Sequence, residues 1–438
     1  MHWHFAPRGR RWFALAAVLI VGSRLAYGQP ADALSLQEAV GLATARSGDA
    51  ETSRASVQAA DERAVAAGQL PDPVLKLGLS NVPLNGSDQY SLSRDSMTMR
   101  SISVMQEFTR ADKRRAKADR YTAEAAAAEA RRTVGLADVQ RNTVAAWLDR
   151  WYAEQTDALL NHHGQPLDLA RQAAMAAYRS GRGTRADVLA ADLEAQKLHD
   201  QQDENRAAIE IATANLERWI GAAARRPLGN RPPLEVPPSV QRLPAAAFDT
   251  VPEVAAAQRD VALAETEIRA VAEAKKPDVT VELMYSQRGA AYSNMGSLNI
   301  SFPVPWDQGN RQDREVAARL AQAQEARAKS EVLRRNTQAM VATRLAELRR
   351  NLDRLKRYDE TTLPLANAQA DAALTAYRAN TGSNTGSLFA VAEANHRAID
   401  IAQERLALEA KTAKLWADLA FLVPMPTAQT EPATGNLQ

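Results

Sequence analysis

The chain has 438 residues, no cysteine, 5% aromatic residues and a formal net charge of +2. The missing cysteine excludes a disulfide scaffold, a thiolate zinc site and a cysteine nucleophile, and the balanced charge argues against a nucleic-acid partner. Few aromatic residues beside abundant Ala, Arg, Glu and Gln indicate long helices. The mean hydropathy of −0.38, with a single long apolar run, excludes a polytopic helical membrane protein.

Residues 1–28 have the layout of a secretory signal peptide. Arg8, Arg10 and Arg11 precede an apolar run over 12–21, and small residues follow it. This order of segments predicts export and cleavage after residue 28. Arg10 and Arg11 leave open whether the route is Sec or twin-arginine export. Because there is no cysteine to acylate, we expect no lipid anchor.

The rest of the chain is predicted to consist of two structural repeats around a linker. Tyr178-Arg179 returns as Tyr377-Arg378, and a Pro-Asp pair likewise occurs once in each half. Between the halves lies a proline-rich stretch, and proline lacks an amide donor and fixes φ, so this stretch is neither helix nor central strand. The predicted boundaries are 29–226 for the first repeat, 227–248 for the linker, 249–423 for the second repeat and 424–438 for a flexible tail.

Each repeat is predicted to contain a helix, two strands and a long helical hairpin. The first helices are expected at 35–69 and 253–275. The proline-free stretches 84–165, 306–363 and 365–423 predict helices far longer than a globular domain uses. From the helices alone, a soluble coiled-coil rod is the favoured interpretation. We interpret the segment from His162 to Pro166, which contains His163 and Gly164, as a connection between helices.

Four runs alternate between apolar and polar residues, which is typical of strands with one polar face. In the second run the apolar parity changes near Arg100, and this change predicts a β-bulge. In an exported protein the alternation fits a transmembrane barrel, and a half-buried sheet on a soluble core is the alternative. Four strands cannot close a barrel, and unpaired edges cannot face lipid, so a barrel requires several copies. The runs are 75–80, 97–106, 279–286 and 298–302.

Several stretches carry a family resemblance. Residues 302–311 and 106–110 stand where a strand pair passes into a helix, and 178–189 stand where two long helices reverse. In this order they resemble the TolC-like outer-membrane factors, the outer membrane efflux proteins that form the exit ducts of tripartite pumps. Residues 81–86 and 97–108 are similar to the outer-membrane components of heavy-metal efflux systems, the cobalt-zinc-cadmium and copper-silver types.

The resemblance implies an α+β membrane protein that is a duct and not an enzyme. Three protomers would share one twelve-stranded β-barrel in the bacterial outer membrane, and their coiled-coil helices would form an α-barrel in the periplasm. The resemblance implies that the protein forms a homotrimer and contacts outer-membrane lipid. It further implies two protein partners, a periplasmic adaptor and an inner-membrane transporter of the resistance-nodulation-division type. The expected cargo is heavy-metal cations. The alternatives are a duct for drugs or a secreted polypeptide, or a periplasmic coiled-coil scaffold without a barrel.

The resemblance places adaptor docking at the two hairpin tips. Glycine permits the positive φ that a reversal of two helices requires. Gly181 and Gly183 match Asn380 and Gly382 in the second half, and asparagine is the next-best residue for this conformation. The expected tip residues are Tyr178, Gly181, Gly183, Thr184, Asp187, Leu189, Tyr377, Asn380, Gly382 and Leu388.

Channels of this family narrow at the periplasmic end, often through acidic side chains after the second tip. Asp187 is acidic in the first half, but its counterpart is Gly386, and the next expected acid falls at Phe389. This departure puts an aspartate ring in doubt. Phe389 would give an apolar constriction, and Glu393 would supply charge one turn deeper. The alternative for each candidate is a packed or solvated helix position.

No catalytic residue, cofactor site or resident metal site is predicted. Thioethers suit soft Cu(I), but we interpret the methionines of the strand windows as fillers on apolar faces. The adjacent residues His162 and His163 are weak evidence for a metal site. We interpret His396 as an ordinary helix position. We interpret the cationic residues from Arg110 to Lys117 as a solvated helix face. The methionines concerned are Met97, Met99, Met105, Met284 and Met295.

Overall fold

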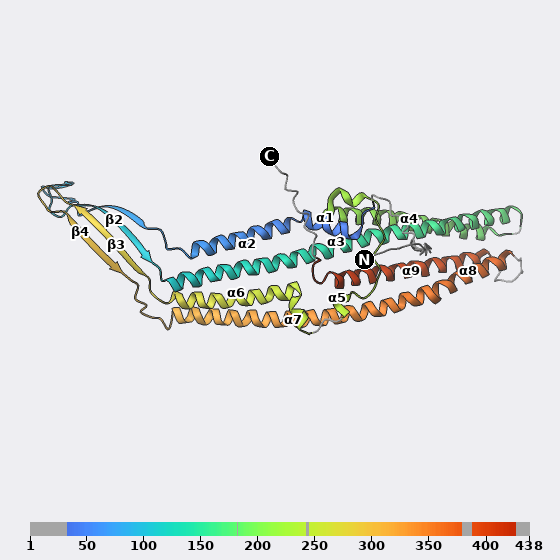
Figure 1. The fold of residues 1–438 in the computed structure, drawn as a ribbon. Coiled ribbons are helices and arrows are strands. Elements are labelled where there is room, and N and C mark those ends of the chain that lie inside the picture. Colours follow the sequence, from blue (N-terminus) through green and yellow to red (C-terminus); the bar gives the residue numbers. More distant parts are fainter. Residues whose placement is uncertain (1–32, 182, 242–244, 379–387, 426–438) are drawn as a thin grey trace, which may run out of the picture.

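The computed structural model describes residues 33–425 except 182, 242–244 and 379–387. The molecule is elongated, with a four-stranded sheet at one end and helical hairpins at the other (Figure 1). The predicted signal peptide lies outside the described residues, as does all of the predicted tail after residue 425.

Helices make up most of the described chain. α3 has 69 residues, which corresponds to a length of about 100 Å, and Figure 1 shows it running from the sheet to the far tip. A π-helical turn at Tyr358–Thr362 joins α7 to α8 without a break. None of the helices in the described ranges is long and apolar enough to cross a membrane. The helices are α1 Leu36–Arg46, α2 Gly48–Ala67, α3 Ala111–Arg179, α4 Arg185–Ile220, α5 Pro238–Gln241, α6 Pro252–Ala274, α7 Gln312–Arg357, α8 Leu363–Arg378 and α9 Leu388–Ala420, with 3₁₀ turns at Gly221–Arg225 and Ala245–Thr250.

Three helix predictions are wrong in detail. The proline-rich stretch, predicted to contain no helix, includes α5 at Pro238–Gln241 and the start of the 3₁₀ turn at Ala245–Thr250, because a proline at the first position of a helix removes no internal hydrogen bond. The single helix expected at 35–69 is two helices, because Ser47 between α1 and α2 has an extended backbone with ψ of 112°. The connection expected around Pro166 is also absent, since α3 continues through it. Proline has a φ close to that of a helix, but inside a helix it removes one backbone hydrogen bond and its ring clashes with the carbonyl four residues earlier, at a cost of about 3 kcal/mol. The long packed helix on either side of Pro166 accommodates this local loss.

The sheet is antiparallel and has the order β1-β2-β3-β4. β2 pairs with β3, so the two halves of the chain meet in the middle of the sheet. The pairing of β2 continues residue by residue on both sides of Arg100, so the predicted bulge is wrong. Arg100 instead lies at one end of a mainly apolar face that also includes Gln106 and Gln287, and Met99 lies on the opposite face. The strands are β1 Val74–Ser80, β2 Met99–Phe108, β3 Val279–Gln287 and β4 Met295–Ser301.

The hydrophobic core lies in the middle of the molecule, between the sheet and the hairpin tips. Trp147 of α3 is fully buried there, and its Nε1 donates to the carbonyl oxygen of Leu34 at 3.3 Å. Around it pack α1, the end of α4 and the end of α9. A second cluster packs Val240 and Phe248 of the linker region against Leu348 of α7. The long hairpins on one side and the sheet on the other thus extend from one packed belt.

Candidate functional site

One face of the sheet is apolar and exposed. Paired residues of neighbouring strands share a face, so Leu77 of β1 lies level with Ile102 and Tyr285. Leu77 is 77% exposed and Leu298 is 63% exposed. On a monomer surrounded by water, a continuous band of exposed aliphatic side chains would be energetically unfavourable. The apolar residues of this face include Leu75, Leu77, Leu79, Ile102, Val104, Val281, Leu283, Tyr285, Leu298 and Ile300.

The other face of the sheet is polar. Lys76 Nζ lies 3.3 Å from Glu282 Oε1, and Ser103 Oγ donates to the same oxygen at 2.7 Å. Lys76 Nζ also lies 3.2 Å from the sulfur of Met105. The interpretation of the strand methionines as fillers on an apolar face is therefore wrong for four of the five, because the register places these four on the polar face. They are Met99, Met105, Met284 and Met295.

Asp278 connects the sheet to the long helix α3. Its carboxylate accepts a hydrogen bond from the backbone amide of Arg110 at 3.1 Å and pairs with Lys113 of the first turn of α3. Asp278 is buried. The cations expected on a solvated helix face are therefore not all solvated: Lys113 is engaged, whereas the side chain of Arg115 is 74% exposed.

At the far end of the molecule, two glycines shape the turn between α3 and α4. Gly181 has a φ of +68°, which confirms the positive φ expected there. The same expectation is wrong for Gly183, which is needed for space: a Cβ on it would lie 3.0 Å from the Cβ of Ala177. Thr184 caps α4, and Asp187 completes the capping box by accepting from the Thr184 amide at 2.9 Å.

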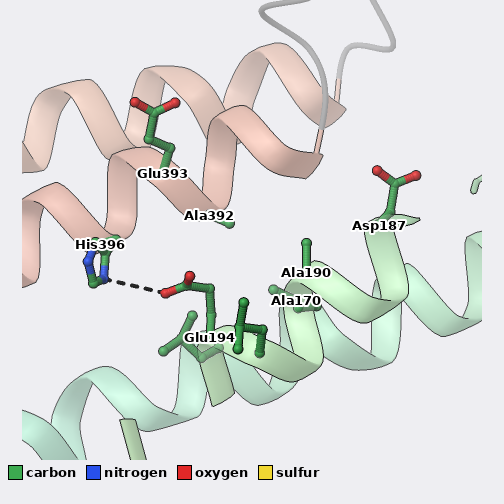
Figure 2. A pocket seen from close by; sticks show the side chains of 10 residues that line it. Ala170, Asp187, Ala190, Glu194, Ala392, Glu393 and His396 are labelled. Carbon is green, nitrogen blue, oxygen red and sulfur yellow. Dashed lines mark ion pairs between the residues drawn. The ribbon is translucent and has the colours of Figure 1, made fainter. Parts of the chain in front are cut away.

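A pocket of about 250 Å³ opens between this hairpin and α9 (Figure 2). Across it, His396 Nδ1 lies 3.6 Å from the Glu194 carboxylate. On its own helix, His396 Nε2 lies 3.6 Å from Asp400. Two aperture candidates, Asp187 and Glu393, line the same pocket. The apolar lining comprises Leu167, Ala170, Ala190, Ala191, Leu193 and Ala392.

Each acidic aperture candidate already has a partner within its own helix. Asp187 belongs to the capping box of α4, and Glu393 pairs with Arg397 one turn later at 2.8 Å. The sequence interpretation missed His396. Asp400 stands four residues later, a spacing that brings helical side chains together, but Glu194 comes from the other half of the chain.

The remaining predicted site residues fall into three groups. Tyr178 and Leu189 are exposed near the described tip, and Tyr377 is half-buried near the end of α8. Leu388 and Phe389 begin α9. Asn380, Gly382 and Gly386 lie outside the described residues. Within the ranges that the structure describes, no group of three His, Asp or Glu side chains is placed to hold a metal ion.

Comparison with known proteins assigns the fold. No family model and no curated protein matches the chain. Among solved structures, the outer membrane protein VceC from Vibrio cholerae matches 89% of this chain and 96% of its own, with a TM-score of 0.64 and 16% identity. The CmeC outer membrane channel from Campylobacter jejuni matches 90% of this chain and 87% of its own, with a TM-score of 0.65 and 13% identity. A membrane protein from Pseudomonas aeruginosa matches 90% of both chains, with a TM-score of 0.70 and 16% identity. The chain therefore has the fold of bacterial outer-membrane channels.

Proposed function

We propose that this protein is a TolC-like outer-membrane factor, the exit duct of a tripartite efflux pump. The observation that carries the proposal is the sheet, which has one exposed apolar face and one polar face. In a membrane barrel the first would meet lipid and the second would line a water-filled lumen. The fold shared with outer-membrane channels supports this proposal.

A single copy cannot form the barrel. Within the described chain β1 and β4 each pair on one side only, and an unpaired strand edge is unfavourable in lipid. Single-chain barrels of this type have at least eight strands, so several copies of a four-stranded sheet must combine. We take the assembly to be a trimer with a twelve-stranded barrel, from which the long helices continue as a periplasmic α-barrel. The two repeats around 227–248 would then each supply one strand pair and one helical hairpin.

The hairpin tips at the far end are the proposed docking site for a periplasmic adaptor, which would connect the duct to an inner-membrane transporter. Asp187 and Glu393 are the candidates near the periplasmic aperture that line one pocket. The proposed cargo is heavy-metal cations. The duct itself performs no chemistry, and the transporter would supply the energy.

Two neighbouring residues of β4 provide a matched test of the barrel. Leu298 is on the apolar face and Asn299 is on the polar face. An arginine on the lipid face costs about 2–4 kcal/mol near the bilayer centre, so Leu298→Arg should remove the protein from the outer-membrane fraction. Asn299→Arg should leave assembly intact and change the conductance of the protein in planar lipid bilayers. Equal assembly of both variants, together with detergent-free solubility, would indicate a scaffold without a barrel.

The cargo needs a separate test. The gene is deleted in a host without a redundant system, and growth is measured on zinc, cobalt, cadmium, copper and silver and on a panel of drugs. Loss of metal tolerance with unchanged drug tolerance supports the cation duct. The reverse pattern would reassign the cargo and leave the duct intact.

A further inference from the structure

Methionine side chains, and therefore thioether sulfur atoms, lie on the polar face of the sheet. We infer that Met105 of β2, Met284 of β3 and Met295 of β4 form a row of weak binding sites for a soft monovalent cation, Ag(I) or Cu(I), along the lumen. The inference rests on the proposed function, because the polar face must line the duct for a cation to pass along it.

The register of the sheet places the three methionines on one diagonal. Met105 is paired with Glu282, two residues before Met284 on the same strand. Met284 is paired with Ser297, two residues after Met295 on the same strand. Each methionine is thus one strand over and two residues along from the next. Such diagonal neighbours are about 7–8 Å apart, within reach of long side chains. The row therefore crosses three strands without a gap.

The segregation of side chains argues that this placement is not simple packing. Within the four strands, all of which the structure describes, the polar face carries a single aliphatic residue, Val74, besides its methionines. Leucine, isoleucine and the aromatic residues of the strands lie on the other face. A methionine that served only as filler would be expected among them. A thioether that faces water instead offers a ligand that selects soft cations such as Cu(I).

The charges beside the row leave room for a cation. Lys76 Nζ donates to the sulfur of Met105 at 3.2 Å, so a cation at Met105 must displace this exposed ammonium, whose charge is balanced by Glu282 at 3.3 Å. Met284 has serines as its paired neighbours on both sides, Ser103 and Ser297. Separate single thioethers bind more weakly than a closed cage. Weak, repeated sites suit a duct, because conduction requires that a bound ion can leave.

The test uses the full chain purified in detergent, with ¹³C-labelled methionine methyl groups and Ag(I) in chloride-free buffer. Ag(I) should shift the methyl resonances of Met105, Met284 and Met295. It should leave that of Met340, which packs in α7 against the second core cluster, unchanged. Zn(II) serves as the harder control ion and should shift none of them. Absence of the three shifts with Ag(I), or an equal response to Zn(II), would overturn the inference.

Substitution separates the row from general sulfur binding. The triple variant Met105→Leu, Met284→Leu, Met295→Leu should raise the apparent Kd for Ag(I) at least about tenfold, and Met340→Leu should leave it unchanged. If neither variant lost Ag(I) binding, or if both variants lost it, the methionine row would be contradicted. Bilayer conductance of the wild-type protein is measured in parallel. If the protein conducts but does not bind Ag(I), the methionine row is refuted and the proposed duct is retained. If it binds Ag(I) but does not conduct, the proposed duct and its lumen are refuted.

Discussion

Glu409 of α9 is buried and paired with Arg231 of the linker between the two halves. The same carboxylate pairs with Arg405 one turn earlier on α9. Arg405 also contacts Asp359 of the π-helical turn at 2.8 Å. The guanidinium of Arg231 lies 5.9 Å from the ring centroid of Trp151 in α3. One carboxylate thus connects the linker, α9, the π-helical turn and α3 in the central belt.

We predict that Glu409→Gln destabilises the protein. The amide would leave two arginines without their shared negative partner, and an unmade buried hydrogen bond costs about 1–3 kcal/mol. The measurement is the midpoint of thermal unfolding in detergent. Glu51→Gln is the matched control, because Glu51 pairs with Arg54 at the surface, where both side chains are more than 70% exposed. An exposed pair contributes about 0–1 kcal/mol, so equal shifts in both variants would contradict the assigned role of Glu409.

Tyr152 is predicted to make stability depend on alkaline pH. Burial, and then the negative charge of Glu409, raise the pKa of its phenol well above the ordinary value of 10. The unfolded chain ionises this phenol near pH 10 while the folded protein still holds the proton. Its contribution to stability is therefore present below pH 10 and is lost as the pH rises toward the folded pKa.

Tyr152→Phe removes the ionisable group and should flatten the decline of the unfolding midpoint above about pH 10. Tyr90→Phe is the control, because Tyr90 is exposed in the loop between β1 and β2. Its unfolding midpoint should decline with pH as that of the wild type does. If Tyr152→Phe followed the wild-type curve, the phenol would not be the source of the alkaline effect.

The strands could be predicted closely because their signal is local. Alternation with a period of two placed all four within a few residues of their observed bounds. The segment around Arg100 was misinterpreted because Met99 on the polar face and Arg100 on the apolar face together imitate a shift of parity, and only the neighbouring strands fix the register. The continuation of α3 through Pro166 depends on packing along its whole length, which a local rule does not include.

The candidate site was predictable only in part. Gly181 followed from the need for a reversal between two helices, and its φ of +68° agrees. The pairings of Asp278 with Lys113 and of His396 with Glu194 join residues far apart in the sequence. No spacing within one element indicates such pairs. They become visible when the antiparallel sheet and the hairpins place the two halves side by side.

Asp278→Asn is predicted to loosen the junction between the sheet and α3. Asparagine keeps an oxygen for the Arg110 amide but removes the charge opposite Lys113. Hydrogen bonds to charged groups contribute about 1.5–3 kcal/mol, so amide exchange in the first turn of α3 should become at least about tenfold faster. Asp72→Asn is the control, since Asp72 stands in the corresponding Pro-Asp pair of the first half and is exposed. Identical exchange in the two variants would show that the charge of Asp278 does not hold the junction.

Gly183→Ala is predicted to open the hairpin tip and to impair the export that we propose for this protein. A methyl group at this position would lie 3.0 Å from the Cβ of Ala177 and 3.2 Å from the backbone nitrogen of Tyr178, and backbone cannot move aside as a flexible side chain does. Amide exchange should rise in the first turn of α4, where Thr184 caps the helix, and tolerance of the exported compound should fall at an unchanged outer-membrane level. Gly135→Ala in α3 is the matched control, because nothing lies within 4 Å of an added Cβ there. Helix propensity favours that change by up to about 1 kcal/mol. A loss of export in both variants, or in neither, would mean that the close packing at Gly183 does not shape the proposed docking tip.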